Sequence, residues 1–389
     1  MLAILPQYGA IAFVNTEQWI AADQAHCWHP FTRQDDWVKG LPADPLVLVD
    51  GEGSWLTDSE GRRYIDGNSS IWTNIHGHKH PVINEAMIDQ INKVAHTSYL
   101  GFANPRASEL ASRLSALFPP RTLERVFFSD DGSTAVECAL KMEIQYRIQV
   151  GQAERVHFLA FDLSYHGDTL GAASLGGVGE FFEPFRKFGF PVKHLGGIEE
   201  LEQLDDETIK KTAAVIIEPL VQGVNQIRPW PKGMLAKLRM WCDQHDVHLI
   251  LDEVMTGFGR TGKMFACQHE DVIPDYLCLA KGLSGGYMPL AATMVRGEIY
   301  NAFLGGADKA FYYGHSYTAN QLGCAAGLAS LDVFEQEHTL DYLPEKIGYL
   351  TQQLEQLADD EALVHEVRQC GMIAGIELRR SDGRAFDGN

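Results

Sequence analysis

The middle of the chain contains short, continuous apolar runs that end in charged or turn-forming residues. These runs cover residues 125–130, 157–162, 213–219, 248–253 and 276–280. Strands that are buried on both faces have this pattern, and such strands are typical of mostly parallel sheets. We therefore predict an α/β fold with a mostly parallel central sheet covered by helices.

Apolar residues recur at helical spacing in the segments between and around these runs. The segments that predict helices are 80–96, 133–149, 234–246 and 320–337. Residues 46–66 instead alternate apolar and polar positions between glycines, which predicts short strands joined by tight turns. A further strand is predicted at 372–380. We place domain boundaries so that 1–75 and 326–389 form a small lobe and 76–325 form the large domain.

Composition narrows the classes of function. The chain has 389 residues and a formal net charge of −20, which argues against binding to nucleic acid or to an anionic membrane. Its seven cysteines are scattered without a Cys-x-x-Cys pair, as expected of free thiols in a reducing compartment. The apolar start of the chain lacks a basic region, and no run is long enough to span a membrane. We expect a cytoplasmic protein.

Ligands of open parallel sheets bind beyond the carboxyl ends of the strands, so the residues that follow each strand are candidates. Gly132 and Ser133 follow the run 125–130 and begin a helix. Gly132 frees the backbone, Ser133 can cap the helix, and the first amides of the helix are available to an anion such as phosphate. The alternative is an ordinary turn between a strand and a helix.

Two further strand ends carry polar or aromatic residues. Tyr165 is followed by His166 and Asp168, so an aromatic ring that could cover a planar ligand stands beside groups that could orient it. An aromatic residue that only fills the core beside a turn would give the same pattern. Asp252 ends an apolar run and, if buried, needs a cationic partner. The alternative is a carboxylate that caps the next turn.

Lys281 stands in "CLAKGLSGGYMPL", where an apolar run leads into a glycine-rich turn. It is either a surface lysine or a nucleophilic amine at the edge of the sheet. A pyridine aldehyde phosphate would use Lys281, Asp252, Tyr165 and the helix start at 131–134 together. The amine must be neutral to attack, so the pKa of Lys281 is expected to lie below its usual value of about 10.4.

Two other motifs predict no site. Residues 257–263 spell G-x-x-x-x-G-K, but Met264 follows where a phosphate-binding P-loop needs Ser or Thr to hold magnesium. A nucleotide hydrolase is therefore not expected. His76, His78 and His80 alternate in a loop without an acidic neighbour, so no metal site is predicted there.

The ordered motifs "YHGDT", "IIEP", "LDEVMTGFGRTGK", "CLAKGL" and "GHSYTANQLGCAA" resemble those of the class III, fold-type I pyridoxal-phosphate aminotransferases. The resemblance extends over residues 25–377. Within that class, "WHPFT" and "SDDGSTAVE" resemble the branch that makes 7,8-diaminopelargonate from 7-keto-8-aminopelargonate in biotin biosynthesis. The alternatives are another class III enzyme acting on an ω-amino acid, or a catalytically silent partner that binds the cofactor.

The resemblance also implies roles for individual residues. The implied catalytic residues are Lys281 (which forms the Schiff base with pyridoxal 5'-phosphate), Asp252 (which pairs with the pyridine nitrogen) and Tyr165 (which stacks on the ring). The implied cofactor-binding residues are these three with Asp131, Gly132, Ser133, His315 and Ser316. The implied substrate-binding residues are Phe31, Trp72, Tyr165, Arg260, Lys281 and Gly314. Ser316 would reach the phosphate of a neighbouring subunit, so the resemblance implies a homodimer with shared sites.

Some positions differ from the family pattern and keep the amino donor open. Enzymes of this branch that use S-adenosylmethionine carry Pro-Thr-Phe at the position of "HSY" (315–317), tryptophan at Ile71 and tyrosine at Phe31. The motif "HSY" instead resembles the branch that uses lysine. The amino donor is therefore expected to be either S-adenosylmethionine or lysine. Family members continue for several tens of residues and supply an arginine for the substrate carboxylate. We expect either a partial sequence or an incomplete small lobe.

Overall fold

The computed structural model describes residues 15–386, and the chain divides into two compact units. One unit comprises the chain up to Ser70 together with Gly77–His80, and the other comprises Ile71–His76 and the chain from Pro81 onward. Most of the apolar start, for which no signal peptide is predicted, lies outside the described residues. The predicted domain boundaries, with one small lobe built from both ends of the chain, stay a prediction.

The first unit contains a small antiparallel sheet in the order β1-β2-β3. Its elements are α1 (Thr16–His26), α2 (Gln34–Val38), β1 (Leu48–Glu52), β2 (Trp55–Asp58) and β3 (Arg63–Ile65). The turn between β2 and β3 closes on the buried Asp58, whose carboxylate accepts hydrogen bonds from the backbone N–H groups of residues 60 and 62. The predicted short strands within 46–66 are therefore confirmed.

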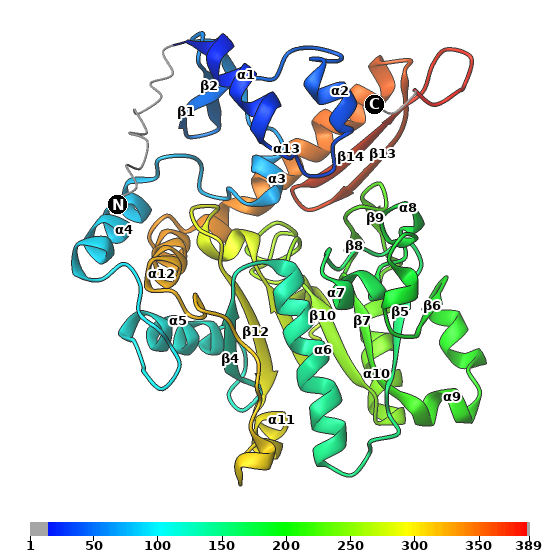
Figure 1. The fold of residues 1–389 in the computed structure, drawn as a ribbon. Coiled ribbons are helices and arrows are strands. Elements are labelled where there is room, and N and C mark those ends of the chain that lie inside the picture. The colour runs from blue at the N-terminus through cyan, green and yellow to red at the C-terminus, as the bar shows by residue number, and fades with distance from the viewer. Residues whose placement is uncertain (1–14, 387–389) are drawn as a thin grey trace, which may run out of the picture. The chain divides into compact units, whose positions relative to one another are not determined.

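The second unit is built on a seven-stranded sheet (Figure 1). In spatial order its strands are β4 (Leu123–Ser129), β12 (Ala291–Arg296), β11 (Tyr276–Leu279), β10 (His248–Asp252), β7 (Thr212–Ile217), β5 (His157–Phe161) and β6 (Val192–Leu195). Only β12 runs against its neighbours within this sheet. The prediction of a mostly parallel α/β sheet is confirmed, whereas β6 and β12 were not predicted.

Both faces of this sheet are covered by helices. Successive side chains of a strand point to opposite faces. In β7, Ala214 and Ile216 pack into one core and Val215 and Ile217 into the other. The first core is shared with α6 (Gly132–Gln149) and α7 (Leu170–Leu175), and the second with α5 (Pro105–Ala116), α10 (Met234–His245) and α12 (Gln321–Gln336). The continuous apolar runs therefore reflect burial on both faces.

The other elements connect the layers or follow them. The helices are α3 (Ser69–Trp72), α4 (Pro81–Lys93), α8 (Gly179–Phe182), α9 (Asp206–Lys211), α11 (Gly297–Ala302) and α13 (Thr339–Asp360). The short 3-10 helices are η1 (Arg186–Phe188), η2 (Ile198–Gln203), η3 (Ala266–His269), η4 (Lys281–Ser284) and η5 (Ala307–Lys309). The remaining strands are β8 (Val221–Gln222), β9 (Arg228–Pro229), β13 (Val364–Cys370) and β14 (Ile373–Leu378). Among residues 15–386, no helix is long and apolar enough to cross a membrane.

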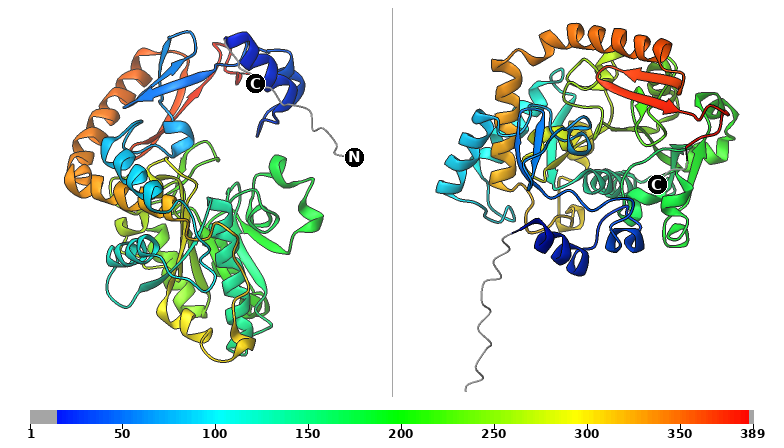
Figure 2. Two further views of the ribbon diagram at one scale, coloured as in Figure 1. Left: turned by 60° about the vertical axis from the view of Figure 1, so that its left-hand side comes forward. Right: turned by 90° about the horizontal axis from the view of Figure 1, so that it is seen from above.

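The chain leaves the sheet through α12, continues into α13 and ends in the β13–β14 hairpin (orange to red in Figure 2). The predicted strand at 372–380 is β14, and its partner β13 was not predicted. The parallel strands β4, β5, β7, β10 and β11 all end at the same edge of the sheet. The segments that follow them are therefore brought together, which is the condition that the strand-end argument requires.

Candidate functional site

A cavity of about 130 Å³ opens at the carboxyl edge of the sheet. The segments that follow β4, β5, β7, β10 and β11 all contribute to it. Its lining residues are Trp72, Gly132, Ser133, Tyr165, His166, Gly167, Glu218, Val224, Asp252, Val254, Met255, Thr256 and Lys281. The structure thus brings together Lys281, Asp252, Tyr165 and the start of α6, the four features that the sequence analysis combined.

Lys281 is the first residue of η4 and is held in the left-handed backbone region, with φ of 46°. A non-glycine residue pays about 1–2 kcal/mol for this conformation, so the surrounding packing must hold it there. Its Nζ atom lies 4.6 Å from the centroid of the Trp72 ring, within the range of a cation–π contact. Burial lowers the pKa of Lys281, although the negative charges of Asp252 and Glu218 oppose this shift. The expected direction of the pKa shift is confirmed.

Asp252 ends β10 and is 5% exposed. Its Oδ2 atom lies 2.8 Å from Nδ1 of His166, and its Oδ1 atom accepts a hydrogen bond from the backbone N–H of Val254. The imidazole is therefore a partner of the carboxylate, a role that the sequence analysis did not assign. Within the described part of the chain, the buried Nε2 atom of His166 has no hydrogen-bond partner. The position of His166 next to Tyr165, just after β5, is the feature of the sequence that could have indicated this role.

Tyr165 is held at both ends. Its hydroxyl donates to Oδ2 of Asp168 at 2.7 Å, and its backbone N–H donates to Oε1 of Glu218 at 3.0 Å. Burial and the neighbouring carboxylates raise the pKa of the Tyr165 hydroxyl, so it remains protonated at neutral pH. The rings of Phe181 and Phe182 lie 6.4 and 6.5 Å from the Tyr165 ring. Glu218 was not among the predicted site residues, although it lies in the motif "IIEP".

The start of α6 differs from the prediction in one respect. The residue that caps the helix is Asp131, whereas the prediction that Ser133 caps it is wrong. Ser133 lies inside the first turn, where its hydroxyl instead accepts a hydrogen bond from the backbone N–H of Asp168 at 3.0 Å. A Cβ atom at Gly132 would lie 2.7 Å from the Val254 side chain, so only glycine fits. Of the first three amides of this helix, that of Thr134 donates to the capping Oδ1 atom of Asp131 at 2.9 Å, which leaves those of Gly132 and Ser133 available to an anion.

Arg260 lies outside the cavity lining but close enough that its positive charge lowers the pKa of Lys281. Burial lowers the pKa of Arg260 itself to about 10, which still leaves the guanidinium charged at neutral pH. Its Nη2 atom is buried and, as far as residues 15–386 show, has no hydrogen-bond partner. A buried cationic group without an acceptor is suited to an anionic ligand group.

The other predicted residues do not line this cavity. His315 lies with its Nδ1 atom 3.6 Å from Oδ2 of Asp130, just before the start of α6, and Gly314 adopts φ of +147°. Ser316 is exposed, and Phe31 belongs to the first unit and is 72% exposed. The roles of Phe31 and residues 314–316 stay predictions.

The two rejected motifs have ordinary contacts. Residues 257–263 form turns, and the Nζ atom of Lys263 donates to the carbonyl of Gln268 at 2.7 Å. His76 lies 3.1 Å from the hydroxyl of Ser330. In the part of the chain that the structure describes, no group of three or more histidine, cysteine or acidic side chains could hold a metal ion.

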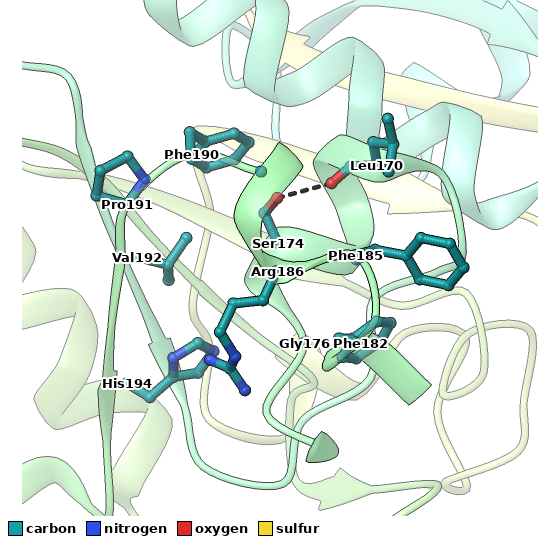
Figure 3. Close-up of a pocket in the computed structure, with 12 residues that line it drawn as sticks. Leu170, Ser174, Gly176, Phe182, Phe185, Arg186, Phe190, Pro191, Val192 and His194 are labelled. Carbon is teal, nitrogen blue, oxygen red and sulfur yellow. Dashed lines mark hydrogen bonds between the residues drawn. The ribbon is translucent and has the colours of Figure 1, made fainter. Parts of the chain in front are cut away.

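A second pocket, drawn in Figure 3, shares no lining residue with the first, but its Phe182 ring lies 6.5 Å from the ring of Tyr165. Its volume is about 310 Å³, and it lies between α7, η1 and β6. Its polar groups are already paired. Ser174 donates to the carbonyl of Leu170, and Arg186, which is exposed, forms an ion pair with Glu183 at 2.9 Å. None of its described lining residues has a buried polar side-chain atom without a partner.

The chain is similar to known proteins over most of its length. The family model for class-III aminotransferases matches residues 40–386. An adenosylmethionine-8-amino-7-oxononanoate aminotransferase of Geobacter sulfurreducens is 46% identical over 92% of this chain and 83% of the relative.

Two solved structures share the fold. The crystal structure of adenosylmethionine-8-amino-7-oxononanoate aminotransferase from Methanocaldococcus jannaschii has a TM-score of 0.91 at 38% identity, covering 95% of this chain and 87% of that one. A thermostable (S)-enantioselective omega-transaminase from Thermomicrobium roseum has a TM-score of 0.87 at 34% identity, covering 97% and 88%.

Proposed function

Because the chain belongs to the class-III aminotransferases, which are pyridoxal-phosphate enzymes of fold type I, we propose that it converts 7-keto-8-aminopelargonate to 7,8-diaminopelargonate in biotin biosynthesis. The observation that carries the proposal is the position of Lys281, whose amine has a lowered pKa and lies in one cavity with Asp252 and Tyr165. The similar enzymes support the choice of substrate, and the residues of the cavity support the transamination chemistry.

The residues of the cavity fit pyridoxal phosphate. Gly132 and Gly167 line the cavity at positions where no side chain fits, because a Cβ atom would lie 2.7 Å from Val254 at the first and 2.4 Å from the Ser133 hydroxyl at the second. The start of α6 would hold the phosphate, and Asp252 would hold the ring nitrogen in its protonated form. Lys281 would hold the aldehyde carbon, and the unpartnered Nε2 atom of His166 leaves one more polar contact for the ligand.

When bound, the cofactor carries the amino group and delocalises the negative charge that develops at the reacting carbon. The protein provides the rest. The Nζ atom of Lys281 carries the proton to and from the reacting carbons, a role that its lowered pKa favours. Asp252 stabilises positive charge at the ring nitrogen, and His166 fixes the orientation of that carboxylate. Tyr165 covers the site, with its hydroxyl held by Asp168.

Trp72 and Arg260 are the proposed substrate contacts. Trp72 lines the cavity beside Lys281, so its ring can pack on the aliphatic part of the substrate. Arg260 offers a charged group whose Nη2 atom lacks a partner among residues 15–386, and a carboxylate of the substrate or donor would supply the acceptor. Both roles stay proposals, as does that of Phe31.

We also propose a homodimer. Segment 97–104 lies against segment 317–321, since Thr97 and Asn104 form hydrogen bonds to Gln321 and Ala319. Large apolar side chains near this contact are exposed, namely Leu100 (89%), Phe102 (70%), Tyr312 (84%) and Tyr317 (59%). Exposed apolar surface of this kind marks an interaction site, and a second copy of the chain would cover it. The expected cytoplasmic location also stays a prediction.

The test is a donor and acceptor panel with the cofactor-loaded protein. We expect 7-keto-8-aminopelargonate to be aminated with either S-adenosylmethionine or lysine as donor, and the donor that bleaches the visible absorbance of the bound cofactor identifies the branch. The similarity to an omega-transaminase favours one alternative, an enzyme acting on ω-amino acids. Turnover of those amines without amination of 7-keto-8-aminopelargonate would establish that alternative instead.

A further inference from the structure

Glu218 lies directly after β7 and is 6% exposed. Its Oε1 atom accepts a hydrogen bond from the backbone N–H of Tyr165 at 3.0 Å, and its Oε2 atom accepts one from the backbone N–H of Gly223 at 2.8 Å. Both partner segments contribute residues to the cavity that contains Lys281. One buried carboxylate therefore connects two loops of the site.

This connection depends on the protonation of the carboxylate. When Glu218 is ionised, both oxygens accept from the backbone N–H groups; when it is protonated, one oxygen carries a hydrogen and can lose its bond. Burial raises the pKa of Glu218 to about 7, with the charge of His166 acting against this shift and that of Asp252 adding to it. Lys281 and Glu218 both line the cavity, and the negative charge of Glu218 raises the pKa of Lys281.

We propose that Glu218 is a positioning residue that holds Tyr165 and the Gly223 segment around the cofactor, and that protonation of its carboxylate releases this hold. The proposal rests on the proposed function, because it places pyridoxal phosphate in this cavity. It adds a residue to the site that acts through Tyr165 and gives cofactor binding a specific dependence on pH near neutrality.

Glu253 is a matched control within the same chain. It is 0% exposed, and its carboxylate accepts hydrogen bonds from the backbone N–H groups of Ala266 at 2.6 Å and Cys267 at 2.8 Å. Burial raises its pKa, as it does for Glu218. Glu253 does not line the cavity, and none of its hydrogen bonds reaches Tyr165 or Gly223, although its Oε2 atom also accepts one from the hydroxyl of Thr256, which does line the cavity. Replacing either residue by glutamine substitutes a donor for one of two acceptors.

The experiment measures the affinity of the cofactor-free protein for pyridoxal phosphate in the wild type, Glu218→Gln and Glu253→Gln. We expect Glu218→Gln to bind about tenfold more weakly than the wild type at about pH 8.5, since one hydrogen bond that places Tyr165 is lost. The ratio of the two affinities should fall towards one at about pH 6, because Glu218 of the wild type is then protonated and loses the same hydrogen bond. Glu253→Gln should keep the wild-type affinity at every pH, even though its melting temperature falls.

Three outcomes would overturn the inference: equal affinities of Glu218→Gln and the wild type, a loss that is the same at every pH, or the same loss in Glu253→Gln. If Glu218→Gln does not fold, hydrogen exchange in the wild type replaces it. The backbone amides of Tyr165 and Gly223 should then lose protection several-fold as the pH falls below about 7, and unchanged protection would contradict the proposal. A wild type that binds no pyridoxal phosphate would refute the proposed function itself.

Discussion

The two pockets differ in the state of their polar groups as well as in size. The pocket between α7, η1 and β6 has about 310 Å³, whereas the cavity at the strand ends has about 130 Å³. In the larger pocket Arg186 is exposed and paired with Glu183. At the smaller cavity Lys281 is mostly buried, and within residues 15–386 the Nε2 atom of His166 has no partner. Unpaired polar groups in a buried place, rather than volume, indicate a site for chemistry.

The largest expected effect is that of Lys281→Ala. Turnover should fall by on the order of 10⁴-fold or more, because the variant loses both the covalent attachment and the amine that carries the proton. Cofactor binding through the start of α6 and Asp252 should remain measurable. The measurement is a rate assay together with a titration of the cofactor.

Lys263→Ala is the matched control. Lys263 is the lysine of the G-x-x-x-x-G-K motif, and its Nζ atom donates to the backbone carbonyl of Gln268. Its removal should change turnover by less than about twofold, since an exposed single hydrogen bond contributes little. Retained turnover in Lys281→Ala, or loss of turnover only in Lys263→Ala, would contradict the assignment of Lys281 as the catalytic lysine.

The next effect is that of Asp252→Asn, which keeps the size of the side chain but removes its charge. Turnover should fall by about 10²–10³-fold, because the ring nitrogen of the cofactor is no longer held in its protonated form. The rate is measured at saturating donor, so that weaker binding is separated from slower proton transfer.

Asp275→Asn provides the comparison for this change. Asp275 is also a buried aspartate beside the central sheet, but it stands before β11 and forms ion pairs with Arg239 and Arg296. Its loss should lower the melting temperature and leave the turnover of the folded enzyme within about twofold of the wild type. Equal losses of turnover in both variants would show that Asp252 acts through the fold alone.

The sequence predicted the central sheet and the convergence of its strand ends because both depend on local patterns. An apolar run that ends in Asp252 or leads to Lys281 is visible without the structure, and parallel strands place their ends at one edge. The strands β6 and β12 were missed. β12 is the antiparallel strand of the sheet, and its short run follows a glycine-rich turn that hides its start.

Contacts between distant residues were the part that could not be predicted. The bonds of His166 to Asp252 and of Tyr165 to Glu218 join segments far apart in the sequence, so no local pattern reports them. Ser133 was predicted to cap α6 because serine is a common cap, but Asp131 occupies that position and turns Ser133 toward Asp168. Which of two good capping residues caps the helix depends on where the preceding strand ends and the helix begins.

A smaller effect is expected for Arg260→Gln. The KM of a carboxylate-bearing substrate should rise by about 10–100-fold with a smaller change in kcat, because a charge-assisted contact is replaced by a neutral one. Since Arg260 also lowers the pKa of Lys281, its loss should shift the rise of activity with pH towards higher pH. Steady-state kinetics over a range of pH measure both changes. A change in kcat alone, with KM and the pH profile unchanged, would exclude a role in substrate binding.

The smallest effect is that of Arg186→Gln, the corresponding change in the larger pocket. Arg186 is exposed and paired with Glu183, so its loss should cost less than about 1 kcal/mol of unfolding free energy. Activity and the KM of every substrate should stay within about twofold of the wild type, because water already screens this charge. Denaturant unfolding and steady-state kinetics measure the two quantities. If Arg186→Gln raised the KM as much as Arg260→Gln, the larger pocket would take part in substrate binding, and unpaired burial would no longer distinguish the two sites.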